Sequence, residues 1–149
     1  MDLAALFDYE HDANRRALGA LRGTPEAPPR ARALLAHVLA AQRVWVERMQ
    51  TGKSGTPVWP DLALNDCERW LDENRVLLGA FLASPEATRG RAFRYHSTGG
   101  VGYESTVGDV LMHLLLHGAT HRGQIAAAVR AAGGTPPMTD YVAHTRRRT

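Results

Sequence analysis

"HLLLHGATHRGQ" (residues 113–124) places three histidines, His113, His117 and His121, at a spacing of four in a chain that has only seven. Because an α-helix advances about 100° per residue, residues at this spacing lie on one side of a helix. Two histidines four apart can bind the same metal ion, but His113 and His121 would lie about 12 Å apart along the axis, too far to share one. The stretch therefore predicts a helix in which either 113 and 117 or 117 and 121 bind a metal, and the spacing leaves both pairs open.

The residues around this stretch indicate where the helix begins and ends. Thr106 followed by Asp109 is typical of a helix start, and Gly133-Gly134 with two prolines behind them predicts an end near Ala132. Apolar side chains recur at helical spacing in three earlier segments as well. These segments cover about residues 3–22, 30–50 and 65–83.

The remaining segments are rich in glycine and proline or alternate in polarity. Residues 91–107 favour a short hairpin, with a turn at Gly99-Gly100. Asn65 and Glu68 are spaced as a capping pair at the start of the third helix. Together these patterns predict an all-α fold, an antiparallel four-helix bundle with a short hairpin between helices 3 and 4, in one domain covering residues 1–149. The loop lengths do not decide the order of the helices around the bundle.

Composition and charge narrow the function classes. The chain has 149 residues, is 44% hydrophobic and 22% charged, and carries a formal net charge of +3. No apolar run has the roughly 20 residues that span a bilayer, and the acidic N-terminus differs from a signal peptide, so we expect a cytoplasmic protein with no membrane partner. The arginines are scattered apart from the C-terminal run 146–148, which we interpret as a solvated tail, and we expect no nucleic-acid partner. The single cysteine, Cys67, excludes an internal disulfide and a cysteine-based zinc cluster.

Two nitrogen ligands leave a metal site incomplete, because zinc and related ions take at least three protein ligands. His37 is the best third candidate, since it lies among leucine, valine and alanine on the second helical segment, where a buried histidine needs a partner. His11 is a weaker candidate among charged neighbours, and we expect neither His96 nor His144 to bind metal. Two alternatives stay open: hydrogen-bonded core histidines and a histidine ladder at a dimer interface. The acid of the H-E-x-x-H motif is missing, which excludes a zinc protease of that type.

Four stretches resemble the DinB family. "HLLLHGATHRGQIAAAVRAAGGTPPMTDYVAH" (113–144) closely resembles that family's last helix and tail, in which the third histidine precedes Arg-Gly-Gln. "LLAHVLAAQRVWVERM" (34–49) resembles its second helix, "HDANRRAL" (11–18) its first, and "STVGDVLMH" (105–113) the approach to its fourth.

The resemblance implies a four-helix bundle, a homodimer and a divalent metal ion, with zinc or nickel as the first candidates. Carried over residue by residue, it implies His37, His117 and His121 as the ligands. His113 and Gln124 then become supporting residues, and Gln124 orients a ligand or a metal-bound water. The resemblance suggests no role for the two residues between His121 and Gln124: we expect Gly123 to allow close helix approach and Arg122 to anchor the tail or an interface.

The wider superfamily includes mycothiol-dependent isomerases and bacillithiol S-transferases, which implies a metal-dependent thiol S-transferase acting on a small electrophile. The missing acid agrees with this hypothesis, because a thiolate needs no separate glutamate base. Two alternatives remain: a metal-dependent hydrolase that takes an acid from Asp8, Asp12 or Glu104, and a non-catalytic, stress-linked metal-binding protein. The sequence leaves open whether the protein is an enzyme.

Overall fold

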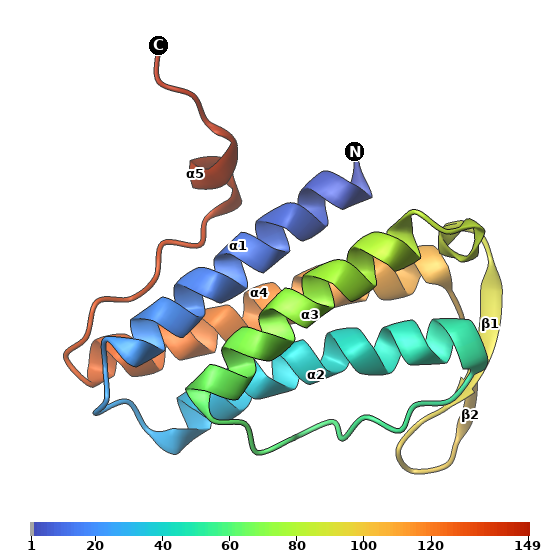
Figure 1. Cartoon of the computed structure of the whole chain (residues 1–149), viewed down its shortest axis with the longest axis horizontal. Coiled ribbons are helices and arrows are strands. Elements are labelled where there is room, and N and C mark those ends of the chain that lie inside the picture. Colours follow the sequence, from blue (N-terminus) through green and yellow to red (C-terminus); the bar gives the residue numbers. More distant parts are fainter. Residues whose placement is uncertain (1) are drawn as a thin grey trace.

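The computed structural model describes residues 2–149 and shows a mostly helical fold with one small sheet (Figure 1). The four long helices are α1 (Leu3–Arg22), α2 (Pro29–Thr51), α3 (Leu64–Leu82) and α4 (Val107–Ala131). The short elements are η1 (Pro85–Ala87), β1 (Ala92–His96), β2 (Gly102–Thr106) and α5 (Tyr141–Thr145). The predicted helices and hairpin are therefore present, whereas α5 was not predicted. Among the described residues, no helix is both long enough and apolar enough to cross a bilayer.

Each long helix packs mainly against two others, in the order α1, α3, α2, α4 and back to α1. In Figure 1, α2 and α3 run in the same direction, because residues 52–63 lead the chain back along the molecule. Twelve extended residues reach about 40 Å, which matches the roughly 35 Å length of a 23-residue helix such as α2. We expected each helix to run antiparallel to the next one in the chain. This holds for the pair α1 and α2 and for the pair α3 and α4, but α2 and α3 are parallel.

The hairpin leads directly into α4. Strands β1 and β2 are antiparallel, with Ala92 opposite Thr106 and His96 opposite Gly102. Thr106 then caps α4: its hydroxyl oxygen accepts from the Asp109 N–H at 3.2 Å and donates to the Asp109 carboxylate at 2.7 Å. The predicted helix start is confirmed. Because β2 ends at Thr106 and α4 begins at Val107, α4 starts at the end of the molecule where the hairpin lies.

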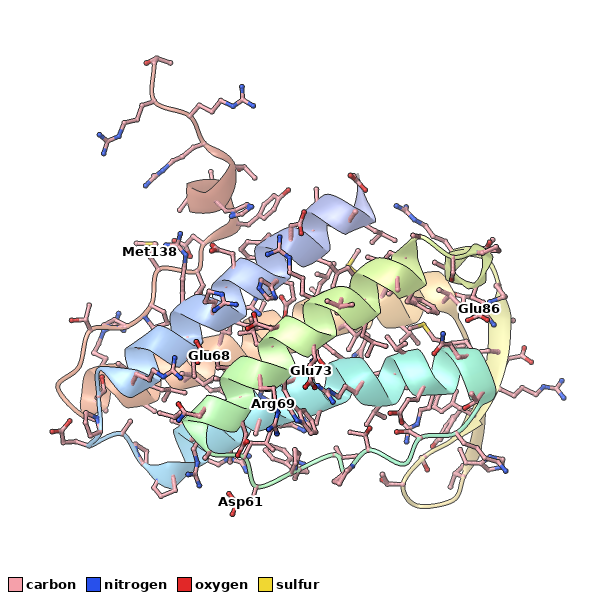
Figure 2. All side chains as sticks on the ribbon, viewed as in Figure 1. Asp61, Glu68, Arg69, Glu73, Glu86 and Met138 are labelled. Carbon is pink, nitrogen blue, oxygen red and sulfur yellow. The ribbon has the colours of Figure 1, made fainter. Side chains whose placement is uncertain are left out.

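The start of α3 differs from the prediction. The helix begins at Leu64 after Ala63, which provides no side-chain cap. Asn65 and Glu68 instead both accept hydrogen bonds from Arg22 of α1, at 3.0 and 2.8 Å. Our capping pair is therefore wrong, because an arginine of the neighbouring helix takes both acceptors. Figure 2 shows Glu68 on the side of α3 toward α1, where it pairs with Arg22, whereas Arg69 and Glu73 lie on the side toward α2.

Buried side chains form two apolar clusters, one toward each end of the helices. Between the helices lie several buried polar groups. Glu10 and Asn14 of α1 and Arg122 of α4 are each about 1% exposed, and Gln42 of α2 hydrogen-bonds to Asn74 of α3. The core is therefore partly polar at mid-length, close to where α2 and α4 carry their histidines.

Candidate metal centre

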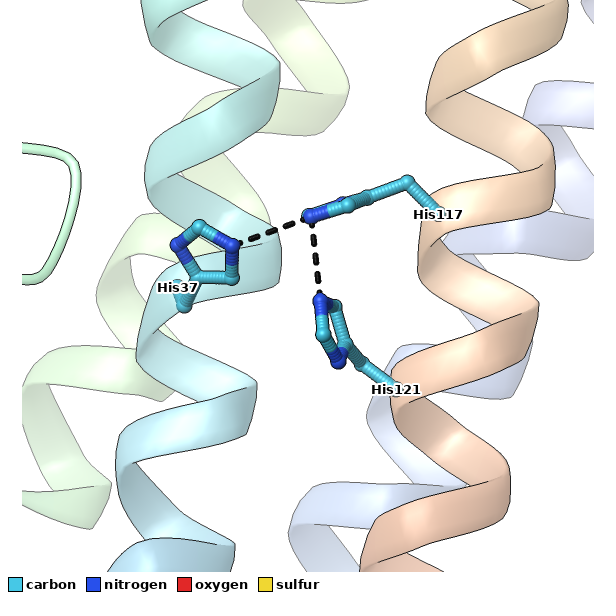
Figure 3. Close-up of side chains that lie close together, drawn as sticks. All are labelled: His37, His117 and His121. Atoms are coloured by element: carbon cyan, nitrogen blue, oxygen red, sulfur yellow. Dashed lines mark hydrogen bonds between the residues drawn. The ribbon is translucent and has the colours of Figure 1, made fainter. Parts of the chain in front are cut away.

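Three histidine rings from α2 and α4 converge between these two helices (Figure 3). The Nε2 atom of His117 lies 3.0 Å from Nε2 of His37 and 3.1 Å from Nε2 of His121. One ligand nitrogen from each ring lies within 4.8 Å of the other two. Adjacent nitrogen ligands at about 2.0–2.1 Å from one ion are separated by roughly 2.9–3.4 Å, so both short distances fit a shared ion.

The hydrogen bonds of two rings determine which nitrogen carries the proton. Nδ1 of His37 lies 2.8 Å from the Val58 carbonyl oxygen, and Nδ1 of His121 lies 2.6 Å from Oε1 of Gln124. Because these oxygens only accept, each Nδ1 donates its hydrogen, and each neutral ring keeps a bare lone pair on Nε2. This is the tautomer in which a histidine binds metal through Nε2.

The two bare lone pairs both face Nε2 of His117. A single proton on that atom can satisfy one of the two contacts, and the other contact then brings two nitrogen lone pairs within about 3 Å. A cation between the rings satisfies all three nitrogens at once. The arrangement of the rings therefore fits a divalent ion better than a hydrogen-bonded histidine cluster.

Burial keeps the central ring neutral. Burial and, to a lesser extent, repulsion from the neighbouring histidines together lower the pKa of His117 to about 4. Burial also lowers the pKa of His37. Nδ1 of His117 is buried and has no hydrogen-bond partner among the described residues. Neutral imidazoles are the form that coordinates metal ions, so the site needs little proton release before it can bind one.

The loop before α3 holds the ring of His37 in place. The indole of Trp59 stacks on that ring, with centroids 3.8 Å apart and planes within 3°. The Arg30 guanidinium lies over the Trp59 ring, 4.6 Å from its centroid. Sequence reasoning missed Val58 and Trp59, because they lie in a segment that composition identifies only as a loop.

The other histidines lie outside the cluster. His113 is exposed on α4, with its ring centroid 5.4 Å from that of His117 and 5.8 Å from that of Trp45. His11 lies on α1 beside Arg15, and His144 lies near Asp12. His96 is the last residue of β1. The structure thus brings together His37, His117 and His121 and leaves His113 at the edge.

None of the three candidate acids joins the cluster. Asp8 lies 3.7 Å from Arg75, Asp12 lies 2.9 Å from Arg16, and Glu104 lies 3.0 Å from Arg94. Each carboxylate is therefore engaged with an arginine on α1, α3 or the hairpin. The cluster itself consists of imidazoles alone.

Arg122 lies on the opposite side of α4 from the three rings, facing α1. Its Nη1 atom lies 2.7 Å from Oε1 of Glu10 and 2.8 Å from Oδ1 of Asn14. Arg122 is buried in this pair and reaches the tail only through Tyr9, whose ring centroid lies 5.7 Å from the guanidinium and whose hydroxyl donates to the Thr139 carbonyl oxygen. Burial raises the pKa of Glu10, against the attraction of Arg122. The signal was present in the sequence, since positions 10 and 14 fall on the apolar stripe of α1.

The close approach of α1 and α4 depends on a different glycine from the one we expected. A Cβ atom on Gly118 would lie 1.9 Å from Oε1 of Glu10, whereas a Cβ on Gly123 would meet nothing within 4 Å. Gly118 therefore leaves room for the Glu10–Arg122 pair. Gly123 faces open space, and our expectation for it is wrong.

The fold and the site together define a mostly helical protein with a three-histidine cluster that could hold a metal ion. The family model for the DinB family matches residues 26–148, and the chain belongs to this family. No curated protein matches the chain. The matched range contains all three clustered histidines together with the loop that orients His37.

Proposed function

We propose that His37, His117 and His121 bind one divalent metal ion, zinc or nickel, and that the protein is a metal-dependent thiol S-transferase. The observation that carries the metal assignment is the pair of bare Nε2 lone pairs facing Nε2 of His117 at 3.0 and 3.1 Å. Family membership supports it, since the match covers all three residues.

A divalent ion bound by three neutral imidazoles keeps its +2 charge and lowers the pKa of a thiol bound beside them. The described residues provide no carboxylate in the cluster, so a nucleophile that needs no general base from the protein is favoured. In the proposed reaction the thiolate sulfur forms a bond to an electrophilic carbon. The leaving group departs with its bonding electrons, and the thiol proton passes to solvent.

The histidine cluster lies next to exposed residues of α4. His117 and His121 are partly exposed, while Gln124 and Leu116 on the same helix are exposed. The ring of His37 is covered by Trp59, which is itself 47% exposed. A small substrate can therefore approach the three nitrogens from this side, which supports a catalytic site over a closed structural one.

We also propose that the ring of four helices is a four-helix bundle and that two chains form a dimer. Met112 and Leu116 lie one turn apart on α4 and are 48% and 62% exposed. Large apolar side chains exposed close together are typical of interaction surfaces. Sedimentation of the purified protein at several concentrations tests this proposal, and a monomer at every concentration would contradict it.

The activity is tested with metal-free protein that is reloaded with zinc or nickel and mixed with a thiol and chlorodinitrobenzene. We expect metal-dependent thioether formation, and we expect His117→Ala to remove it because a three-ligand site rarely survives the loss of one ligand. His144→Ala is the control, since it removes a histidine far from the cluster. A rate that is equal with and without metal would contradict the proposal.

Hydrolysis is the alternative activity and is measured in the same preparations with ester substrates. The acids that could act as a base are paired with arginines elsewhere. We therefore expect thiol transfer to exceed hydrolysis. Metal-dependent hydrolysis without thiol transfer would favour the alternative.

A further inference from the structure

Arg48 lies on α2 and has no acidic partner. Among residues 2–149, no carboxylate lies within ion-pair distance of its guanidinium. The guanidinium instead lies over two aromatic rings, 5.0 Å from the centroid of Trp45 and 5.5 Å from that of Tyr95. These contacts restrict the side chain while leaving its N–H groups available to an anion.

The side chain of Arg48 borders two adjoining hollows of about 310 and 280 Å³ between α2, residues 52–58 and the β1–β2 hairpin. Both hollows are also lined by Val58, Ser97 and Thr98, and one is lined by Lys53. We name them together the Arg48 cleft. No aspartate or glutamate lines either hollow, so the cleft presents positive charge and hydroxyl groups. In Figure 1, the β1–β2 hairpin stands across the end of α2.

Glu47 is the acid nearest to Arg48 in the chain, and it is already engaged. Its carboxylate accepts hydrogen bonds from the hydroxyls of Ser54 at 2.5 Å and Thr56 at 2.7 Å, and from the Gly55 N–H at 3.1 Å. Glu47 thus orders the loop that forms one wall of the cleft. It leaves Arg48 free to pair with an anion from outside the chain.

Residues that line the Arg48 cleft also contact the histidine cluster or its neighbour His113. Val58 lines the cleft, and its carbonyl oxygen accepts the hydrogen bond from His37. Trp45 lines it as well, and its ring lies 5.8 Å from that of His113, which in turn lies 5.4 Å from that of His117. Aromatic and apolar residues therefore lie between the Arg48 cleft and the three clustered histidines.

We infer that the Arg48 cleft binds an anionic group, such as a carboxylate, at the far end of the thiol substrate. This inference rests on the proposed S-transferase function. Arg48 follows His37 by eleven residues, about 16 Å along the axis of α2, so the thiol is an extended molecule with its sulfur at the histidines. Its middle part lies against Trp45 and Val58.

The thiol is the substrate that gains from a second anchor. Its sulfur is held at a position defined by three histidines, whereas the electrophile reaches that sulfur from the side on which His117 and His121 are partly exposed. A carboxylate on Arg48 fixes the other end through charge-assisted hydrogen bonds, which are stronger than neutral ones and can be bidentate. A thiol anchored at both ends is presented in one orientation to the electrophile.

The test uses the cobalt(II)-loaded full-length protein, in which thiolate binding is read from the sulfur-to-cobalt charge-transfer absorption. The probes are ω-mercaptooctanoic acid and ω-mercaptooctanol, which have the same length and differ in the terminal charge. We expect the acid to bind the wild type about tenfold more tightly than the alcohol, as for a hydrogen bond to a charged group. In Arg48→Gln the two probes bind equally.

Arg130→Gln is the matched control, because it removes the same charge from an exposed residue at the far end of α4. We expect it to keep the preference for the acid, and we expect both variants to bind cobalt as the wild type does. Equal binding of the two probes to the wild type would overturn the inference and leave the S-transferase proposal intact. A preference for the acid that persists in Arg48→Gln would also overturn the inference and leave the S-transferase proposal intact.

An absence of the charge-transfer absorption with every thiol would contradict the proposed function instead. In that case the inference about the Arg48 cleft is tested by calorimetry with the S-methylated forms of the two probes. These forms carry the same end groups but cannot form a thiolate. Tighter binding of the S-methylated acid to the wild type than to Arg48→Gln supports the anion site. Equal binding overturns it.

Discussion

The orientation of a histidine ring depends on the hydrogen bond made by its second nitrogen. In this protein the Val58 carbonyl oxygen and the Gln124 side chain take that role for His37 and His121. The first acceptor belongs to the backbone, so only the second can be tested by simple substitution. Gln124 is exposed and lies one turn beyond His121.

We expect Gln124→Leu to weaken metal affinity by about 10- to 100-fold, because the leucine cannot hold the His121 ring in the Nδ1–H tautomer. Gln124→Glu keeps an acceptor at this position and retains the affinity. Thr120→Ala is the control, since its hydroxyl bonds only to the Leu116 carbonyl oxygen of its own helix. Competition with a chromogenic chelator measures all four affinities. Equal affinity in Gln124→Leu and the wild type would remove Gln124 from the site.

The lowered pKa values predict how the stability of the metal-free protein depends on pH. The pKa of His117 is about 4 in the folded protein and 6.5 in its ordinary state, so the unfolded chain binds more protons between these values. The free energy of unfolding therefore falls as the pH decreases from 6.5 to 4. Urea denaturation at several pH values measures this slope. We expect a smaller slope in His117→Asn, and an unchanged slope would contradict the assigned burial effect.

The periodicity of the sequence predicts the histidine stripe but not the choice of ligands. The spacing of four allows both the 113/117 and the 117/121 pair, and only the family resemblance favours the second. The structure shows why: His37 faces 117 and 121, and the ring of His113 lies instead beside Trp45. That pairing depends on how far α2 slides along α4, which no local pattern specifies.

At the scale of the helix, the packing of α1 against α4 depends on Gly118. A Cβ there would lie 1.9 Å from Oε1 of Glu10 and 2.8 Å from Nη1 of Arg122. Both groups are buried, so neither can move into solvent. Breaking a buried ion pair leaves an uncompensated charge, which is strongly destabilising.

We therefore expect Gly118→Ala to destabilise the metal-free protein by about 1–3 kcal/mol through overpacking. Gly123→Ala is the matched control on the same helix, where the added methyl meets open space. It should stabilise the protein by about 0.5–1 kcal/mol, because alanine loses less backbone entropy than glycine. Urea denaturation measures both changes. Shifts of the same sign in the two variants would contradict this account of α1–α4 packing.

The helices themselves could be predicted closely, because apolar periodicity and turn residues act locally. The third helix was expected over 65–83 and occupies Leu64–Leu82, and the fourth was expected to 132 and ends at Ala131. The failures are contacts between helices. Arg22 takes the acceptors that we assigned to an α3 cap, and Arg122 pairs with Glu10 across the core. Each depends on a neighbour that is distant in sequence.

At the scale of the whole molecule, the site exists because the 52–63 loop returns along the helices. That return makes α2 and α3 parallel and places α2 beside α4 (Figure 1). The same loop supplies the Val58 carbonyl oxygen and the Trp59 ring that hold His37. One segment thus sets the helix order and orients one of the three proposed ligands. A bound ion would link α2 to α4 directly.

The central claim is that three histidines from these two helices share one divalent ion. X-ray absorption at the metal edge, recorded on protein purified without chelators and combined with metal analysis, tests it most directly. We predict about one ion per chain, with three imidazole nitrogens at about 2.0–2.1 Å, and loss of that ion in His117→Ala. Metal content and imidazole signals that are unchanged in His117→Ala would contradict the claim.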